Sequence, residues 1–156
     1  MGKVSTKKNK TQYHICRENM GLSREKASEL LAMSPERLER IENEKLAIYP
    51  EEVVAMSKVY NNPNLCNYYC SHKCPIGEKY VPEVKINNLS QIVLEMMVSL
   101  NKANENKNRL MEIIVDGKVS KDELEEFKAI QKQLDDISST ILALKLWAEQ
   151  MVSSEK

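Results

Sequence analysis

The sequence predicts an all-α fold, and three observations support this prediction. The 156 residues include only four glycines, five prolines and 5% aromatic residues, a composition that favours helices over sheets. Apolar residues in the second half recur in steps of three and four, which is the spacing of one helix face. In the first half, Ser23 and Ser34 stand where N-caps of helices are expected. Several short helices should therefore precede two long ones.

The first helices can be placed from their caps and breakers. We expect a first helix over residues 11–20, ended by Gly21. Ser23 and Ser34 then open a second and a third helix. Because only Ala32 and Met33 separate these two helices, they must cross at a steep angle. That arrangement is a helix-turn-helix unit, whose second helix can lie in the DNA major groove.

The rest of the chain divides into a fourth helix, a connector and a hairpin. The fourth helix begins at Pro50 and stops before Pro63. From residue 87 to 156 two long amphipathic helices form an antiparallel hairpin, joined by a turn in which Gly117 ends one helix and Ser120 caps the next with Glu123. A basic arm (1–10), a head (11–65), a Cys-containing connector (66–86) and the hairpin (87–156) are the expected parts.

The head resembles the lambda-repressor-like (XRE/Cro-type) DNA-binding domain over residues 13–65. Arg17 matches the arginine that the family has in its first helix, and Gly-Leu-Ser-Arg at residues 21–24 matches the start of its second helix. Residues 41–45 match the Ile-Glu-x-Gly-Lys-like end of the third helix, and Pro50 matches the proline that follows it. Two positions depart from the family pattern. Glu44 replaces a small residue, and Pro35 occupies the first base-reading position without a side-chain donor.

The resemblance assigns roles to particular residues. The DNA-binding positions it implies are Arg24, Glu36, Arg37, Arg40, Asn43 and Lys45. Arg17 and Glu42 match a structural ion pair that braces the first helix against the third. The Glu36 carboxylate disfavours DNA binding, since among the base edges it can accept a hydrogen bond mainly from the amino group of cytosine.

The net charge is zero, but the charges are unevenly spread. Residues 1–26 carry seven Lys or Arg and two Glu, whereas residues 87–156 carry nine basic and twelve acidic residues. A basic front end suits a DNA-binding head with an attached domain of another function. A lysine-rich N-terminus can equally be a solvated tail.

Three cysteines and a histidine lie close together in the connector: Cys66, Cys70, His72 and Cys74. Such a set can supply four ligands to zinc, although the spacing is not that of a standard zinc knuckle. If the segment is helical, steps of four place the cysteines on one face, where they can pack as small buried hydrophobes. A redox switch is the third interpretation. No other cofactor is indicated.

These observations predict a bacterial, cytoplasmic, XRE-type transcriptional regulator that binds double-stranded DNA and forms a homodimer through the hairpin. No apolar run approaches the ~18 residues of a membrane span, and neither a catalytic constellation nor a small-molecule substrate is evident. The alternative is a protein-interaction module that keeps the helix-turn-helix fold without reading DNA. Pro35, Glu36 and the neutral net charge favour that alternative.

Overall fold

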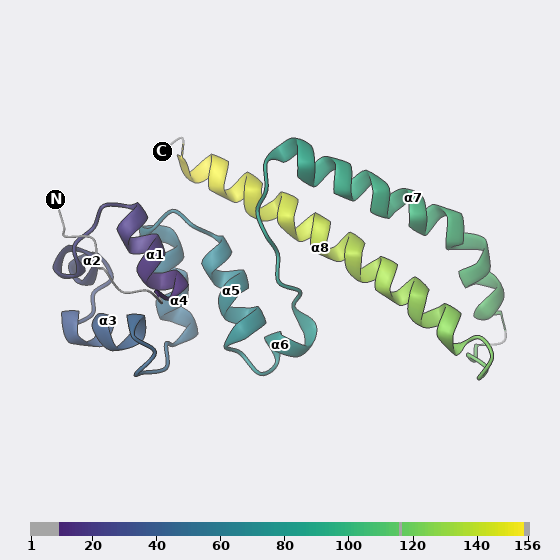
Figure 1. Ribbon diagram of the computed structural model, residues 1–156, viewed down its shortest axis with the longest axis horizontal. Coiled ribbons are helices and arrows are strands. Elements are labelled where there is room, and N and C mark those ends of the chain that lie inside the picture. Colours follow the sequence, from purple (N-terminus) through teal and green to yellow (C-terminus); the bar gives the residue numbers. More distant parts are fainter. Residues whose placement is uncertain (1–9, 116, 155–156) are drawn as a thin grey trace. The chain divides into compact units, whose positions relative to one another are not determined.

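The structure, a computed structural model, describes residues 10–115 and 117–154. Within these ranges it contains eight helices and no strand, so the predicted all-α fold is confirmed. The helices are α1 (Gln12–Asn19), α2 (Arg24–Leu30), α3 (Pro35–Glu42), α4 (Pro50–Val59), α5 (Asn64–His72), α6 (Gly77–Tyr80), α7 (Leu89–Ile113) and α8 (Leu124–Ser154) (Figure 1). The expected basic arm lies outside the described residues except for Lys10, as does Asp116.

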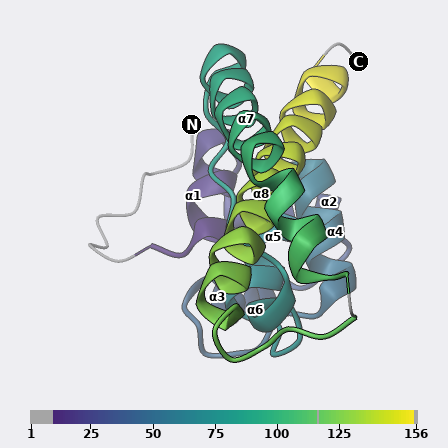
Figure 2. The same ribbon diagram turned by 90° about the vertical axis from the view of Figure 1, so that its right-hand side faces the viewer.

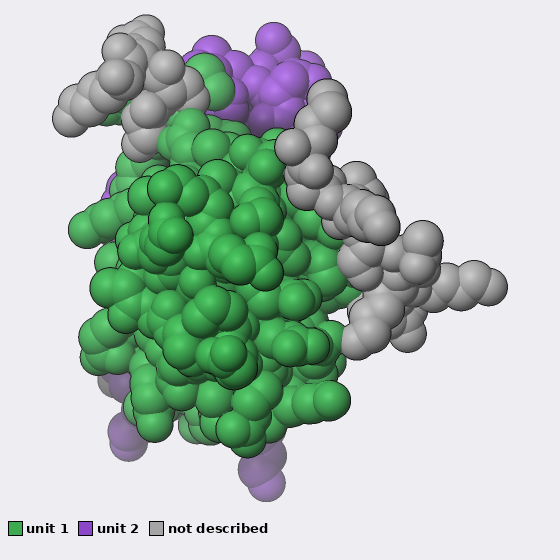
Figure 3. All heavy atoms as spheres, turned by 90° about the vertical axis from the view of Figure 1, so that its left-hand side faces the viewer, with its two compact units in different colours: residues 1–81, 149–156 green, residues 82–148 purple. Residues whose placement is uncertain are grey.

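The chain divides into two compact units (Figure 3). Residues 1–81 together with 149–156 form the first unit, and residues 82–148 form the second. We refer to residues 10–81 as the head unit and to residues 82–148 as the hairpin unit.

One hydrophobic core holds the head unit together. Leu38 and Met56 are completely buried, and Ala27 joins them from the centre of α2. The apolar positions on α2, α3 and α4 face inward because they recur at helical spacing. The core members are Tyr13, Cys16, Ala27, Leu31, Leu38, Ile41, Ile48, Val53, Met56, Tyr60 and Leu65.

The expected connector at residues 66–86 contains two helices, α5 and α6, that belong to the packing of the head unit. α5 packs on α4, and α6 packs on α5. Leu65 is only 2% exposed in the head core, and the ring of Tyr68 meets that of Tyr13 edge-on at 5.8 Å between centroids. Apolar and aromatic side chains on one face of α5 therefore extend the head past residue 65.

Close contact between α5 and α6 requires a glycine. A Cβ atom built on Gly77 would lie 2.0 Å from the carbonyl oxygen of Cys70, well inside van der Waals contact. Backbone meets backbone at this point, so a side-chain rotation cannot relieve the clash. Gly77 is thus what allows the short helix α6 to pack on α5.

The hairpin unit pairs α7 and α8 side by side and antiparallel, as Figures 1 and 2 show. Asn106 Nδ2 on α7 donates to Gln133 Oε1 on α8 at 2.8 Å. Near the start of α7, Ile92 packs with Ala143 and Leu146 of α8. The turn has the expected features: Gly117 has φ +70°, and the backbone N–H of Ser120 donates to Glu123 Oε2 at 3.0 Å. The predicted antiparallel hairpin is therefore confirmed.

The hairpin leaves part of its predicted apolar stripe uncovered. Leu100 is 42% exposed, Leu134 49% and Ile141 42%, while Ile92 and Ile113 are buried. Two helices share a single seam, so apolar residues flanking that seam have nothing to pack on within the hairpin unit.

Replacing Gly77 by alanine should lower the free energy of unfolding by about 1–3 kcal/mol, because α6 must move off α5 to admit the methyl group. Urea denaturation followed by circular dichroism measures the change. Glu78→Ala, at the exposed neighbouring position of α6, is the control and should stay within about 0.5 kcal/mol of the parent. Equal stabilities of the two variants would contradict this account of the contact.

Candidate nucleic-acid interface

Residues 23–43 form a helix-turn-helix unit with both predicted serine caps in place. Ser23 Oγ accepts a hydrogen bond from the backbone N–H of Lys26 at 3.1 Å, and Ser34 Oγ accepts one from Arg37 at the same distance. Between the helices Ala32 adopts a left-handed backbone with φ +52°, which reverses the chain within two residues. The caps satisfy backbone donors that would otherwise have no partner in each first turn.

The outer face of α3 carries both signs of charge. Its inner face is buried through Leu38 and Ile41, and this fixes which side chains point outward. Glu36, Glu39 and Arg40 are exposed. Two carboxylates beside one guanidinium do not make the helix itself a strongly basic surface.

A buried ion pair connects α1 to the end of α3. Arg17 donates from Nε to Glu42 Oε1 at 2.6 Å and from a second nitrogen to Oε2 at 3.0 Å. The Glu42 side chain is fully buried, and Arg17 also donates to the carbonyl of Leu22 at 2.8 Å. Burial acts to lower the pKa of Arg17, but the hydrogen bonds and charge of Glu42 outweigh it and raise that pKa. The structure thus brings together the two residues that the family resemblance paired.

Arg24, expected to contact DNA, lies against the same carboxylate. Both its Nε and one terminal nitrogen are 3.4 Å from Glu42 Oε2, and 31% of its side chain is exposed. Its guanidinium therefore helps to neutralise Glu42 while part of it stays accessible.

Arg37, also expected to contact DNA, is held by the following helix. Its Nε and a terminal nitrogen donate to the two carboxylate oxygens of Glu52 at 2.5 and 2.9 Å. The guanidinium also lies 4.9 Å from the ring centroid of Tyr49, whose backbone N–H donates to Glu52. Burial acts to raise the pKa of Glu52, but the hydrogen bond from Arg37 prevails and lowers it. Arg37 thus braces α3 against α4.

The remaining expected DNA contacts lie at and beyond the end of α3. Arg40 and Lys45 are exposed, and Asn43 Nδ2 donates to the carbonyl of Glu39 at 2.8 Å. Glu44 occupies the position where the family has a small residue, and it adopts φ +55°. A left-handed backbone costs a residue with a Cβ about 1–2 kcal/mol, which explains why that position favours glycine.

The structure does not assemble the cysteine cluster into a metal site. Cys66 and Cys70 lie on α5, whereas Cys74 follows its end, and all four cysteines are free thiols. Among the described residues no group of three or more His, Cys, Asp or Glu side chains is arranged to hold a metal ion. His72 instead stacks on Tyr68, with ring centroids 4.7 Å apart.

Several contacts in the head were not predicted from the sequence. Glu52, which holds Arg37, is 15 residues away from it in sequence, a spacing that gives no local signal. His14 and Glu18 lie at i and i+4 on α1, with His14 Nε2 3.2 Å from Glu18 Oε1. That spacing is a signal that sequence reasoning could have used.

Comparison with known proteins supports the assignment of the head. Residues 14–60 match the family model described as a helix-turn-helix domain. The searches of curated proteins and of solved structures returned no match. A helix-turn-helix domain is typical of DNA-binding regulators rather than of enzymes. Among the described residues, no helix has both the length and the apolar character needed to cross a membrane.

Substituting Arg17 by methionine should lower the free energy of unfolding by about 3 kcal/mol or more, because Glu42 stays buried with one partner lost. Methionine at both positions 17 and 42 should recover much of this loss, since no buried charge is then left without its partner. Urea denaturation measures both effects. Lys26→Met, which breaks the exposed pair with Glu29, is the control, with an expected change below about 1 kcal/mol. A double variant no more stable than Arg17→Met would contradict the assignment.

Proposed function

We propose that this protein is a sequence-specific, DNA-binding transcriptional regulator of the XRE type. The observation that carries the proposal is the serine-capped α2–α3 pair, within a segment that matches a helix-turn-helix domain. In this geometry the second helix presents its outer face to the major groove, while the first crosses the backbone.

Arg40 and Lys45 are the residues we assign to DNA contact. Both are exposed, and within the described part of the chain neither side chain forms an ion pair or a hydrogen bond. Arginine reads guanine through two hydrogen bonds, and lysine neutralises phosphate. Arg24 adds a partly exposed guanidinium next to the start of α2. Glu36 would accept a hydrogen bond from cytosine at the groove floor.

We propose further that the protein is a homodimer formed through the hairpin. Leu134 and Ile141 are seven residues apart on α8, so they lie on one face, and both are more than 40% exposed. On α7, Leu94 is 62% exposed and Met97 50%. A second hairpin packed on these side chains would make a four-helix bundle and bury them. Two heads could then address half-sites about 34–36 Å apart.

A second candidate function is a protein-interaction module that does not read DNA. The observation in its favour is that Arg37 is bound by Glu52 and that Arg24 leans on Glu42, which leaves few basic groups on the presented surface. Glu36 and Glu39 add negative charge to the same helix. Only the first candidate, the DNA-binding regulator, predicts salt-dependent binding to DNA.

Replacing Arg40 by alanine should weaken binding to the preferred DNA sequence about tenfold and relax base preference, because a base-reading contact is lost. Lys45→Ala should weaken all sequences alike and reduce the salt slope by about 1. The preferred sequence is first selected from random duplex DNA with the full-length protein, and affinities are then measured by fluorescence anisotropy at several salt concentrations.

Lys132→Ala, an exposed charge change on α8, is the matched control and should bind as the parent does. Thermal denaturation verifies that each variant is folded. If the parent protein selects no sequence and shows no salt-dependent binding, the DNA-binding proposal fails and the interaction module is favoured.

Replacing Ile141 by glutamate should convert the dimer to a monomer, since a charge would be buried in the bundle. Sedimentation velocity over a range of concentrations reports the change in mass. Lys132→Glu is the control: two positions from Leu134, it lies on nearly the opposite side of α8 and should leave the dimer intact. A parent protein that sediments as a monomer at all concentrations would refute the dimer.

A further inference from the structure

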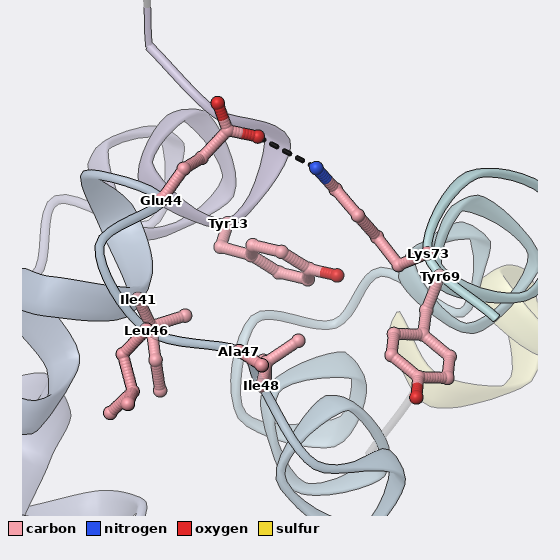
Figure 4. Close-up of a pocket in the computed structure, with 8 residues that line it drawn as sticks. All are labelled: Tyr13, Ile41, Glu44, Leu46, Ala47, Ile48, Tyr69 and Lys73. Carbon is pink, nitrogen blue, oxygen red and sulfur yellow. Dashed lines mark hydrogen bonds and ion pairs between the residues drawn. The ribbon is translucent and has the colours of Figure 1, made fainter.

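The head unit contains a cavity that has no part in the DNA contacts assigned above. Its volume is about 350 Å³, within the range of small-molecule sites. The walls come from α1, from the end of α3 with the loop after it, and from α5, all within the head unit (Figure 4). The lining residues are Tyr13, Ile41, Glu44, Leu46, Ala47, Ile48, Tyr69 and Lys73.

Tyr13 gives the cavity a polar group without a partner. The residue is only 3% exposed, and its hydroxyl forms no hydrogen bond with any described residue. Figure 4 shows its ring reaching across the space between the loop after α3 and α5, with the hydroxyl toward Tyr69 and Lys73. Burial raises the pKa of Tyr13, so the phenol stays protonated and remains a donor. The oxygen of this hydroxyl is almost fully covered, so a ligand's acceptor reaches it only when a neighbouring side chain moves aside, and the hydrogen bond then formed stabilises it.

The charges at the cavity already neutralise one another. Lys73 Nζ lies 2.7 Å from Glu44 Oε1, and this pair joins α5 to the end of the α3 segment (Figure 4). The hydrogen bond that Lys73 donates to Glu44 raises the pKa of Lys73, so its ammonium group stays charged at neutral pH. Because each of these exposed charges already has an opposite partner, neither is left to attract a charged ligand, and an uncharged ligand leaves the pair intact. The other walls are formed by the aliphatic side chains of Ile41, Leu46 and Ile48.

From these features we propose that the cavity binds a small uncharged molecule with an apolar body and one carbonyl group, which accepts a hydrogen bond from Tyr13. The aliphatic walls and the Tyr69 ring contact the body of the ligand, and the Tyr13 hydroxyl orients its carbonyl. This assignment goes beyond DNA binding and does not depend on it.

The position of the cavity connects it to the recognition helix. Ile41 lies in the last turn of α3, and Glu44 precedes Lys45, one of the residues assigned to DNA. A ligand held against Ile41 and the loop would stabilise one arrangement of this segment. The site is therefore placed where an effector could alter the end of α3.

Nuclear magnetic resonance titration of the ¹⁵N-labelled full-length protein tests the proposal with acetophenone and with ethylbenzene, which lacks the carbonyl oxygen. Acetophenone should cause saturable shifts in the amide signals of residues 41–48 and 69–73, and it should bind about fivefold more tightly than ethylbenzene. Tyr13→Phe keeps the ring and removes the hydroxyl, so acetophenone should then bind no better than ethylbenzene.

Two further results decide the interpretation. Leu46→Trp fills the cavity at a half-buried position and should abolish the shifts from both probes. Dispersed amide spectra of both variants verify that they are folded. Absence of saturable shifts in the parent protein, shifts located elsewhere, or unchanged acetophenone affinity in Tyr13→Phe would overturn the proposal. Because no DNA is present, failure of this experiment is independent of the proposed regulatory function.

Discussion

The head depends on one buried carboxylate. Glu42 is the last residue of α3, its side chain is fully buried, and it accepts hydrogen bonds from Arg17 on α1 and Arg24 at the start of α2. Its backbone carbonyl also accepts from the Thr11 hydroxyl at 3.2 Å. An ionised carboxylate is costly to bury, so the arrangement persists only while these donors surround it. Three helices are thereby held in one relative orientation, and that orientation decides which face of α3 is presented.

The same requirement explains the modest charge of the presented face. Arg17 and Arg24 both donate hydrogen bonds to the buried Glu42. Arg37 donates to Glu52 on α4. The basic groups that hold the fold together are thus largely unavailable to a polyanion. In the proposed complex with DNA, base contact would rest on a few side chains near the end of α3, and phosphate contacts from the rest of the surface would have to supply much of the affinity. The sparse charge is a consequence of how the head is braced.

The hairpin poses the opposite problem, an excess of apolar surface. α7 and α8 bury Ile92, Ile130 and Leu146 in their seam, but Leu94, Leu134 and Ile141 stay largely exposed. Exposed apolar residues at heptad spacing typically mark a surface that packs against another helix. The head cavity also contains an unsatisfied group, because the Tyr13 hydroxyl has no acceptor within the described residues. In both places the fold leaves groups without a partner among the described residues.

The sequence by itself determined the local elements. Caps, helix breakers and apolar spacing predict the helix starts at Ser23 and Ser34, the turn with Gly117 and Ser120, and the all-α class. These signals act over a few residues, so they can be recognised in the sequence. The Arg17–Glu42 pairing came from a family pattern rather than from spacing. Tertiary structure alone decided the partners of Arg37, the inclusion of α5 in the head and the cavity beside Tyr13. Those outcomes depend on which residues far apart in sequence meet when helices pack. Local helix propensity does not specify such contacts, because it reflects only neighbouring residues.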